Sequence, residues 1–526
     1  MTDPRHVDDP LADVVDPVDE SGPRSMGEPV AIDEGGDPLL SDEVPGVAVI
    51  SQTQATPSDV ATYRSDGPFS VLDRRPSPSE PRPYRFPQFE RRSLANGLTL
   101  ITADLPGRPL LNAQLIMAGG VAVEPPGSAG VTVMTARAMS EGTTKRDAVE
   151  LVEAAERLGA EIDAEAGWES LAAGVIVPRS RFAAALELLA EVVLSPSFPE
   201  QEVDRLREER LNDLLQARAE PRRRAERVFA ETVYAAAAPY SRPLGGTERT
   251  VAAITRQEVA AVHARLVDPT SATLIVAGDL RGLHIDGLVS SAFGDRRAVQ
   301  PVDLAYTDDV NTRAAAIVVV DRPGSAQSEV RIGHRGVARA VPEFHAIAVL
   351  NTIFGGQFGS RLNQLLREDR GYTYGVHSAF DMRRNRGPFV VRMAVQTEVT
   401  VAALIDALAE LRRIGQAPVE ERELQHARDY LVGVFPLRFE AAPQVATAIA
   451  GLVVHDLPDD ELDRYRPAVA AVTADAVLAA AQGHIRPAEV SVVIVGDAGR
   501  FEADLRAADL GEVSVMADGP PSDVGT

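Results

Sequence analysis

The chain contains no cysteine, so it can form neither disulfide bonds nor thiolate metal ligands. It has no apolar run of transmembrane length, and its N-terminus lacks the basic patch and apolar core of a secretory signal. Positive charge is scarce, because 53 Lys and Arg residues face 77 Asp and Glu residues and leave a net charge of −24. This excess of negative charge disfavours nucleic acid and anionic membranes as partners. We therefore expect a cytoplasmic protein.

The two ends of the chain differ in composition from its middle. With 526 residues, 45% of them hydrophobic and 25% charged, the chain can form several soluble domains. Residues 1–84 are rich in Asp, Glu, Pro, Gly and Ser without an apolar period, which predicts a disordered acidic and Pro-rich region. Residues 75–88 (RPSPSEPRPYRFPQ) have the composition of a linker. Residues 509–526 are predicted to form a short disordered tail.

The middle of the chain contains an internal repeat. Residues 272–279 (ATLIVAGD) are echoed 218 positions later by residues 490–497 (VSVVIVGD). Residues 114–120 (QLIMAGG) are similarly echoed by residues 329–336 (EVRIGHRG), whose last glycine lies 216 positions after Gly120. Nearly equal offsets at two distant anchors predict two copies of one unit. We assign the first half to residues 85–295, a linker to residues 296–312 and the second half to residues 313–508.

Each half is predicted to open with strands, continue with helices and close on the strand that leads into Gly-Asp. In the first half, alternating apolar residues predict strands at 98–103, 113–118, 161–165 and 170–176. Helical periods are found at 131–140, 148–158, 180–194, 199–217, 222–237 and 256–266. In the second half they are found at 342–353, 400–413, 419–434 and 473–483. The sequence therefore predicts an α+β protein with two homologous halves in tandem.

One segment of the second half, residues 354–380 (FGGQFGSRLNQLLREDRGYTYGVHSAF), concentrates residues that can do chemistry. Apolar residues at helical spacing predict an amphipathic helix over 358–369, which Gly371 ends. Alternation then predicts a strand over 374–380. Arg367 lies in the last helical turn and Tyr374 at the entrance of the strand, seven positions on. Taken alone, Arg367 could be a solvated cation and Tyr374 a half-buried strand residue.

Four motifs in order make the chain resemble the pitrilysin/insulinase family of zinc peptidases. They are residues 239–247 (PYSRPLGGT), 268–279 (DPTSATLIVAGD), 327–334 (QSEVRIGH) and the 354–380 segment. The resemblance covers residues 91–505 and implies two α/β-sandwich half-domains, each a metallopeptidase-like, antiparallel-rich sheet covered by helices. In that family an Arg and a Tyr hold the substrate opposite the zinc, and they fall on Arg367 and Tyr374. A guanidinium can donate to peptide carbonyls and a phenol to an oxyanion.

The zinc motif of the resembled family has no counterpart here. Active members carry H-x-x-E-H on the first helix and a further Glu on a later one. Aligned on Gly130 and on Gly142-Thr143, the two His positions fall on Val133 and Arg137, and the Glu between them falls on Ala136. The later Glu falls on Asp213. We therefore predict no metal in this chain, with Val133, Ala136, Arg137 and Asp213 as degenerate zinc-site positions.

These observations predict a catalytically incomplete subunit of a zinc peptidase. A zinc-bearing homologous partner, in a heterodimer or a larger heteromer, would supply the metal, and this chain would supply Arg367 and Tyr374 for peptide or protein proteolysis. The chain would then be inactive alone. The alternative is a non-catalytic scaffold or peptide-binding pseudo-peptidase. On the edge strand to which family members add substrate, Asp163-Ala164 replaces the usual Asn-Ala. For Trp168, the only tryptophan, we expect a packing or rim role.

Overall fold

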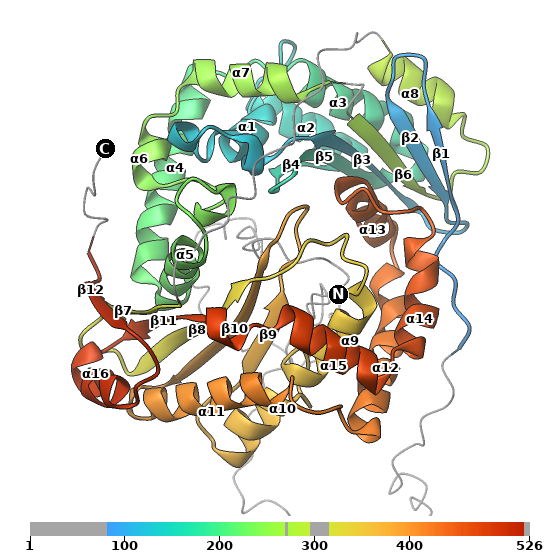
Figure 1. Cartoon of the computed structure of the whole chain (residues 1–526). Helices are drawn as coiled ribbons and strands as arrows, with labels where there is room; N and C mark the ends of the chain where they lie inside the picture. The colour runs from blue at the N-terminus through green and yellow to red at the C-terminus, as the bar shows by residue number, and fades with distance from the viewer. Residues whose placement is uncertain (1–81, 269–271, 295–314, 520–526) are drawn as a thin grey trace, which may run out of the picture. The chain divides into compact units, whose positions relative to one another are not determined.

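The computed structural model describes residues 82–268, 272–294 and 315–519, and within these ranges the strands form two six-stranded sheets (Figure 1). The first has the order β1-β2-β6-β3-β5-β4 and the second the order β12-β7-β11-β8-β10-β9. The first sheet consists of β1 Phe89–Ser93, β2 Thr99–Asp104, β3 Leu110–Ala118, β4 Glu161–Ala166, β5 Ser170–Pro178 and β6 Ala272–Gly278. The second consists of β7 Ile317–Asp321, β8 Gln327–Arg335, β9 Val376–Phe380, β10 Pro388–Gln396, β11 Ser491–Gly496 and β12 Val513–Ala517.

The matching strand order confirms the predicted repeat. β6 and β11, the strands that lead into Gly-Asp, each run parallel to the strand that lies near the start of its half, β2 or β7. On their other side they pair antiparallel with β3 or β8, the strands of the second repeated motif. The hairpins β4–β5 and β9–β10 then extend each sheet to one edge. The fold is α+β with two homologous halves, as the sequence indicated.

Helices cover both sheets. In the first half they are α1 Val131–Met139, α2 Ala148–Leu158, α3 Phe182–Leu194, α4 Glu200–Ala219, α5 Pro221–Val233, α6 Glu248–Ala252, α7 Arg256–Leu266 and α8 Ile285–Phe293. In the second half they are α9 Phe344–Phe354, α10 Arg361–Asn363, α11 Thr400–Arg413, α12 Glu421–Val434, α13 Ala442–Val454, α14 Glu461–Ala471, α15 Ala474–His484 and α16 Ala498–Ala507. Among the described helices, none is by itself both long and apolar enough to span a membrane.

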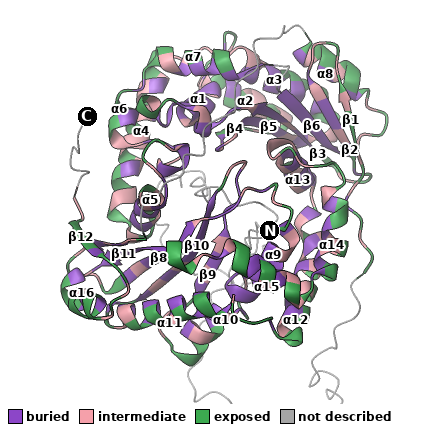
Figure 2. Cartoon of the chain, in the orientation of Figure 1, coloured by how far each residue is buried: buried purple, intermediate pink, exposed green. Residues whose placement is uncertain are grey.

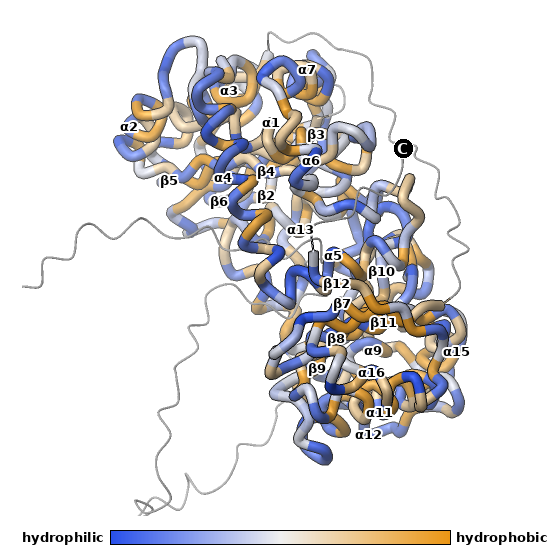
Figure 3. Tube along the Cα trace, turned by 90° about the vertical axis from the view of Figure 1, so that its left-hand side faces the viewer, coloured by the Kyte–Doolittle hydropathy of each residue, from blue (hydrophilic) through white to orange (hydrophobic). Residues whose placement is uncertain are grey.

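Local sequence signals explain several element boundaries. Asp147 and Glu150 form a capping box at the start of α2, and Gly159 ends that helix in a left-handed conformation with φ of 61°. Thr255 and Glu258 form the same box at α7. β6 lies in the middle of its sheet, and all of its residues are buried. The strands are mainly buried, while the outer faces of the helices are exposed (Figure 2). Hydrophobic residues lie along β7 and β11 themselves (Figure 3).

Each sheet is contacted on one face by a helix that belongs to the other half of the chain. α13 packs on β3 and β6 of the first sheet, and α5 packs on β8 and β11 of the second. Phe229 of α5, for example, lies in one core cluster with Val390 and Val493 of the second sheet. We call the sheet face that meets the exchanged helix its inner face. The opposite faces are covered by helices of their own half, such as α1 and α3 on β5.

The structure corrects the prediction for the C-terminal tail. β12, Val513–Ala517, lies inside the predicted disordered segment 509–526 and pairs in parallel with β7. At the other end, Tyr84 lies within the region predicted to be disordered, yet its ring contacts Phe435 with centroids 6.1 Å apart. The predicted linker 296–312 and residues 1–81 lie outside the described residues.

Candidate functional site

The positions aligned with the zinc motif lie on α1, which packs against α4. Val133 is half-buried, Ala136 is buried against the core of the first half, and Arg137 is exposed. Arg137 donates from Nη2 to Oε2 of Glu209 on α4, 2.9 Å away. This ion pair lies one helical turn before Asp213 on α4. The structure therefore brings together α1 and α4, the two helices that carry the positions aligned with the zinc motif. Arg137, a cation, occupies the position aligned with the second His.

Arginines hold the Asp213 carboxylate. Arg210, one turn earlier on α4, donates to Oδ2, and Arg223 of α5 donates to Oδ1 over 2.9 Å. Partial burial alone would raise the pKa of Asp213, but the hydrogen bonds and charges of Arg223 and Arg210 outweigh it and lower this pKa. The carboxylate is thus ionised and paired within the chain.

These residues do not fit zinc. Val133 and Ala136 offer no lone pair, and guanidinium groups stand where a cation would bind. A lone carboxylate that two arginines already hold cannot replace four ligands. Within the described ranges, no cluster of three or more His, Asp or Glu side chains is arranged to hold a metal ion.

Arg367 lies on a π-helical segment, Gln364–Asp369, that continues α10. Its guanidinium carbon lies 4.2 Å from the ring centroid of Phe358, whose side chain is 66% exposed. Nε of Arg367 is 3.4 Å from the half-exposed Glu368 carboxylate. A ring face holds a guanidinium without using its N–H groups, so donors remain for a ligand. π-Helical turns are frequent at functional sites.

Tyr374 extends from a short loop into solvent, and its side chain is 91% exposed. The strand entrance is later than predicted, because β9 begins at Val376. The backbone on either side of Tyr374 is fixed, since Thr373 Oγ1 donates to the carbonyl of Ala394 over 2.7 Å. The side chain of Asn363 binds both the N–H and the C=O of Val376, at 3.1 and 2.8 Å. A braced loop therefore presents a fully accessible phenol, unlike the half-buried residue that the alternative predicted.

Sequence reasoning missed the residues that build this loop. The helix predicted over 358–369 gives Asn363 no special role, although a buried Asn before a loop often binds backbone groups. Gly355 has a packing reason to be glycine, because a Cβ there would lie 2.5 Å from Ser378 Oγ of β9. The predicted helix includes Phe358, whereas the helix of the structure begins only at Arg361.

The two sets of predicted residues are separate. Among the described residues, no hydrogen bond or ion pair joins Arg367 or Tyr374 to α1 or α4. Trp168, by contrast, joins the halves: its ring lies 5.2 Å from that of Tyr240 and 4.3 Å below the guanidinium carbon of Arg383, which follows β9. Trp168 is buried, which fits packing better than a rim position.

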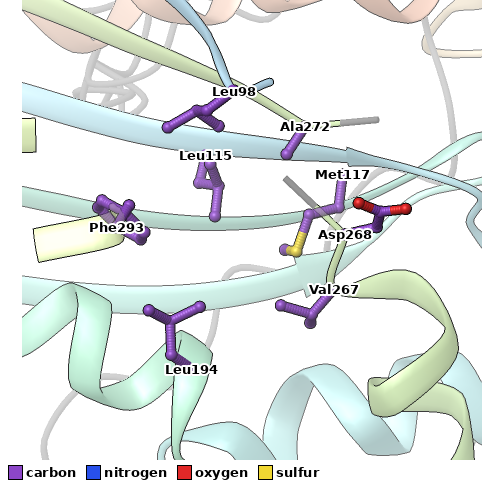
Figure 4. A pocket seen from close by; sticks show the side chains of 8 residues that line it. All are labelled: Leu98, Leu115, Met117, Leu194, Val267, Asp268, Ala272 and Phe293. Carbon is purple, nitrogen blue, oxygen red and sulfur yellow. The ribbon is translucent and has the colours of Figure 1, made fainter. Parts of the chain in front are cut away.

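Two cavities in the described part of the chain lie away from the predicted site residues. The cavity in Figure 4 measures about 20 Å³ and is lined mainly by apolar side chains such as Leu115, Met117 and Phe293. It is no larger than a water molecule requires. A second, open groove of about 650 Å³ is lined by Ser325, Gln327 and Glu398, among others. None of the predicted site residues lies in either.

The fold and the site define a metallopeptidase-like protein of two homologous halves. Residues 100–248 match the sequence family described as insulinase (peptidase family M16), and residues 253–431 match the one described as peptidase M16 inactive domain. Together these segments cover more than half of the chain, which therefore belongs to the M16 family.

Named relatives are similar to this chain in sequence, and solved structures are similar to it in fold. A Mycobacterium bovis protein named an uncharacterized zinc protease is 26% identical over 368 residues, covering 70% of this chain and 83% of the relative. A Streptomyces coelicolor protein with the same description is 26% identical over 397 residues, or 74% and 86% of the two chains. The structure of a peptidase M16 inactive domain from Pseudomonas fluorescens matches with a TM-score of 0.71 at 24% identity, over 78% of this chain and 98% of that one. A protease from Helicobacter pylori matches with a TM-score of 0.73 at 18% identity, over 78% and 100%.

Proposed function

We propose that this chain is the substrate-holding subunit of a heteromeric zinc peptidase. Arg367 binds the backbone of a peptide, and Tyr374 donates a hydrogen bond to the oxyanion that forms during cleavage. The metal and the attacking water come from a homologous partner that carries H-x-x-E-H. The observation that carries this proposal is the contrast between a degenerate metal position, filled by paired arginines, and a braced, 91%-exposed Tyr374.

The chemistry of the two residues suits this division of roles. The Arg367 guanidinium can offer paired N–H donors to peptide carbonyls, and its stacking on Phe358 limits its rotation. The phenol of Tyr374 can approach an oxyanion that lies outside this chain, because almost nothing of its own chain covers it. A residue that worked only within its own chain would gain nothing from this exposure.

Reconstitution tests the proposal. The tagged chain is purified with its native partners, and cleavage of an unstructured peptide is measured for the complex and for each separated subunit. We expect cleavage by the complex alone, with zinc in the partner and below about 0.1 equivalent in this chain. Stoichiometric zinc in the isolated chain, or cleavage by it, would contradict the proposal.

The second candidate is a scaffold or peptide-binding pseudo-peptidase. The ion-paired Asp213 favours it, because those pairs stabilise α4 and α5 without any role for a partner's metal. A native complex that contains no zinc-bearing homologue but retains peptide binding would select this candidate over the first.

A further inference from the structure

The second sheet differs from the first at one edge. In the first sheet, the strand at the edge beside β2 is β1, which precedes β2 in the chain and forms an antiparallel hairpin with it. In the second sheet, the strand beside β7 is β12, which runs parallel to β7 and is the last described element of the chain. β12 can therefore leave its sheet without displacing any other described element.

Burial of β12 itself contributes little to holding this strand in place. Val513 is its only buried residue, and the large side chains of Val515 and Met516 are 39% and 40% exposed. By comparison, every residue of β11, on the other side of β7, is buried. Segments with few buried apolar contacts open most readily, so β12 needs anchors at its ends to stay on β7.

Side chains anchor β12 at both ends. At its start, Nη1 of Arg506 on α16 donates to the carbonyl oxygen of Val513 over 3.0 Å. At its end, Asp518 accepts at Oδ1 from Nε of Arg224, 3.1 Å away, and its Oδ2 lies 3.2 Å from Nε of Arg322. Arg322 follows β7 directly, whereas Arg224 lies on α5, the helix of the first half that packs on the second sheet. One carboxylate therefore joins β12 both to its own sheet and to the exchanged helix.

Arg224 depends on this contact. The side chains of Arg224 and Asp518 are only 7% and 11% exposed. Among the described residues, Asp518 is the only side chain that binds the guanidinium of Arg224. A buried charge that loses its partner is strongly destabilising, so departure of Asp518 favours displacement of Arg224 as well. The positions of α5 and β12 are therefore coupled, and this coupling acts in both directions.

We propose that β12 is a detachable strap that locks the exchanged helix α5 onto the second sheet through Asp518. α5 also carries Arg223, which binds Asp213, and Glu226, which binds Arg331 of the second sheet. Release of β12 loosens the helix on which both contacts depend. The strap thus controls how firmly the two halves of the chain hold each other, and this role requires no zinc-bearing partner.

Hydrogen–deuterium exchange of the isolated full-length chain tests the lock. In Asp518→Ala, we expect amide exchange of α5 to become about tenfold faster or more, together with that of β12. α3, on the opposite face of the first sheet, should exchange as in wild type. Glu512→Ala, at the other end of β12, is the matched control. The described hydrogen bonds of this exposed residue involve its backbone alone, so α5 should stay protected.

A second substitution shows whether the unpaired guanidinium causes the change. Asp518→Ala combined with Arg224→Met removes the buried charge and keeps a long apolar side chain. The exchange rate of α5 should then return to within about threefold of wild type. This double variant also decides the case in which Asp518→Ala unfolds the whole chain, because rescue would then restore protection throughout.

A synthetic peptide of residues 511–519 tests whether β12 is detachable. Added in excess to the full-length Asp518→Ala chain, the peptide should displace the weakened strap and restore the protection of α5. The same peptide with Asp518→Ala should restore nothing.

Four results would overturn the inference. They are wild-type exchange of α5 in Asp518→Ala, equal exchange of α5 in Asp518→Ala and Glu512→Ala, no rescue by Arg224→Met, and no restoration by the peptide. These results differ from failure of the proposed function. That failure would appear as cleavage by the complex that does not depend on Tyr374, with the expected exchange pattern of α5 intact.

Discussion

The two inner faces have the same topology but opposite electrostatics. On the second sheet, Arg331 and Arg392 are both bound by Glu226 of α5, through Oε1 at 2.5 and 2.9 Å. On the first sheet, the equivalent exchanged helix is α13, whose sequence APQVATAIAGLVV contains no charged residue. One inner face therefore has its charges paired within the chain. The other carries Glu161, Asp163 and Glu165 of β4 opposite an exchanged helix without charged residues. The difference teaches that the exchanged helix determines whether the charges of an inner face are paired within the chain.

Removing Glu226 should give the largest effect on stability. Arg331 is only 1% exposed and would keep Glu329 alone as its acidic partner in Glu226→Ala. Removing one partner of a buried ion pair costs about 3–5 kcal/mol of unfolding free energy. Because Glu329 remains as a partner of Arg331, we expect a loss of about 3 kcal/mol. Urea unfolding measures it. The pair of Glu231, which is 45% exposed, with Arg227 on the same helix provides the control. Because Arg227 also binds Glu248, Glu231→Ala should cost less than about 1 kcal/mol. Equal losses would contradict the comparison.

Acid should weaken the same contact. Burial alone would raise the pKa of Glu226, but Arg392 and Arg331 outweigh it and lower this pKa from 4.5 to about 2. A depressed carboxyl pKa stabilises the fold fully above the ordinary value and loses that contribution as pH falls towards 2. In Glu226→Gln, unfolding free energy should therefore depend less on pH between 4.5 and 2 than in wild type. Parallel pH profiles would rule out this role of Glu226.

Rebuilding the metal site should require removal of its arginines. A variant with the family's ligands carries Val133→His, Ala136→Glu, Arg137→His and Asp213→Glu. We expect it to bind zinc roughly 10- to 100-fold more weakly than the same variant that also carries Arg210→Ala and Arg223→Ala, the scale of changes around metal ligands. Isothermal titration calorimetry measures both affinities. Equal affinities would show that the arginines do not oppose the metal.

Neutralising Asp163, on the inner face of the first sheet, should give a small gain in the free energy of unfolding. Loss of surrounding water, with repulsion from Glu165 and Glu161, raises the pKa of Asp163 from 3.8 to about 6. A raised carboxyl pKa destabilises the fold above that value, and the cost disappears as pH falls towards 3.8. Because the side chain is exposed, Asp163→Asn should gain only about 0.5–1 kcal/mol at pH 8.

Thermal unfolding at pH 8 and pH 4 measures this gain. Glu156→Gln, which neutralises an exposed helix carboxylate, should change stability at neither pH. A gain for Asp163→Asn that persists undiminished at pH 4 would refute the electrostatic cause.

Much of the fold could be predicted from local signals. The repeated strands β6 and β11 have near-continuous apolar sequences that end in Gly-Asp, and helices such as α2 carry their own caps. The sequence did not predict β12, because this short strand pairs only with β7, almost 200 positions earlier in the chain. The exchange of α5 and α13 could not be predicted either, since neither the charged, amphipathic α5 nor the mostly apolar α13 encodes which sheet it will contact.

The residues of the candidate site could be predicted from the sequence, but their contacts with neighbouring side chains could not. The alternation of apolar residues predicts that Tyr374 lies in a strand. In the structure, Asn363 binds the backbone of Val376, and β9 begins at Val376, two residues after Tyr374. The ion pairs around Asp213 depend on Arg223 of another helix, so no motif on α4 could reveal them. Side-chain contacts between neighbouring elements, not propensity, decided both outcomes.

The most direct test of the account is the turnover of the native complex containing Tyr374→Phe. The account predicts a loss of about 10²-fold or more in kcat, the scale of removing one oxyanion donor, with assembly and zinc content unchanged. Tyr372→Phe, the same chemical change two residues away, should cleave like wild type. If the complex contains a zinc-bearing partner and Tyr374→Phe also cleaves like wild type, the chain does not complete its partner's site and the central claim is wrong.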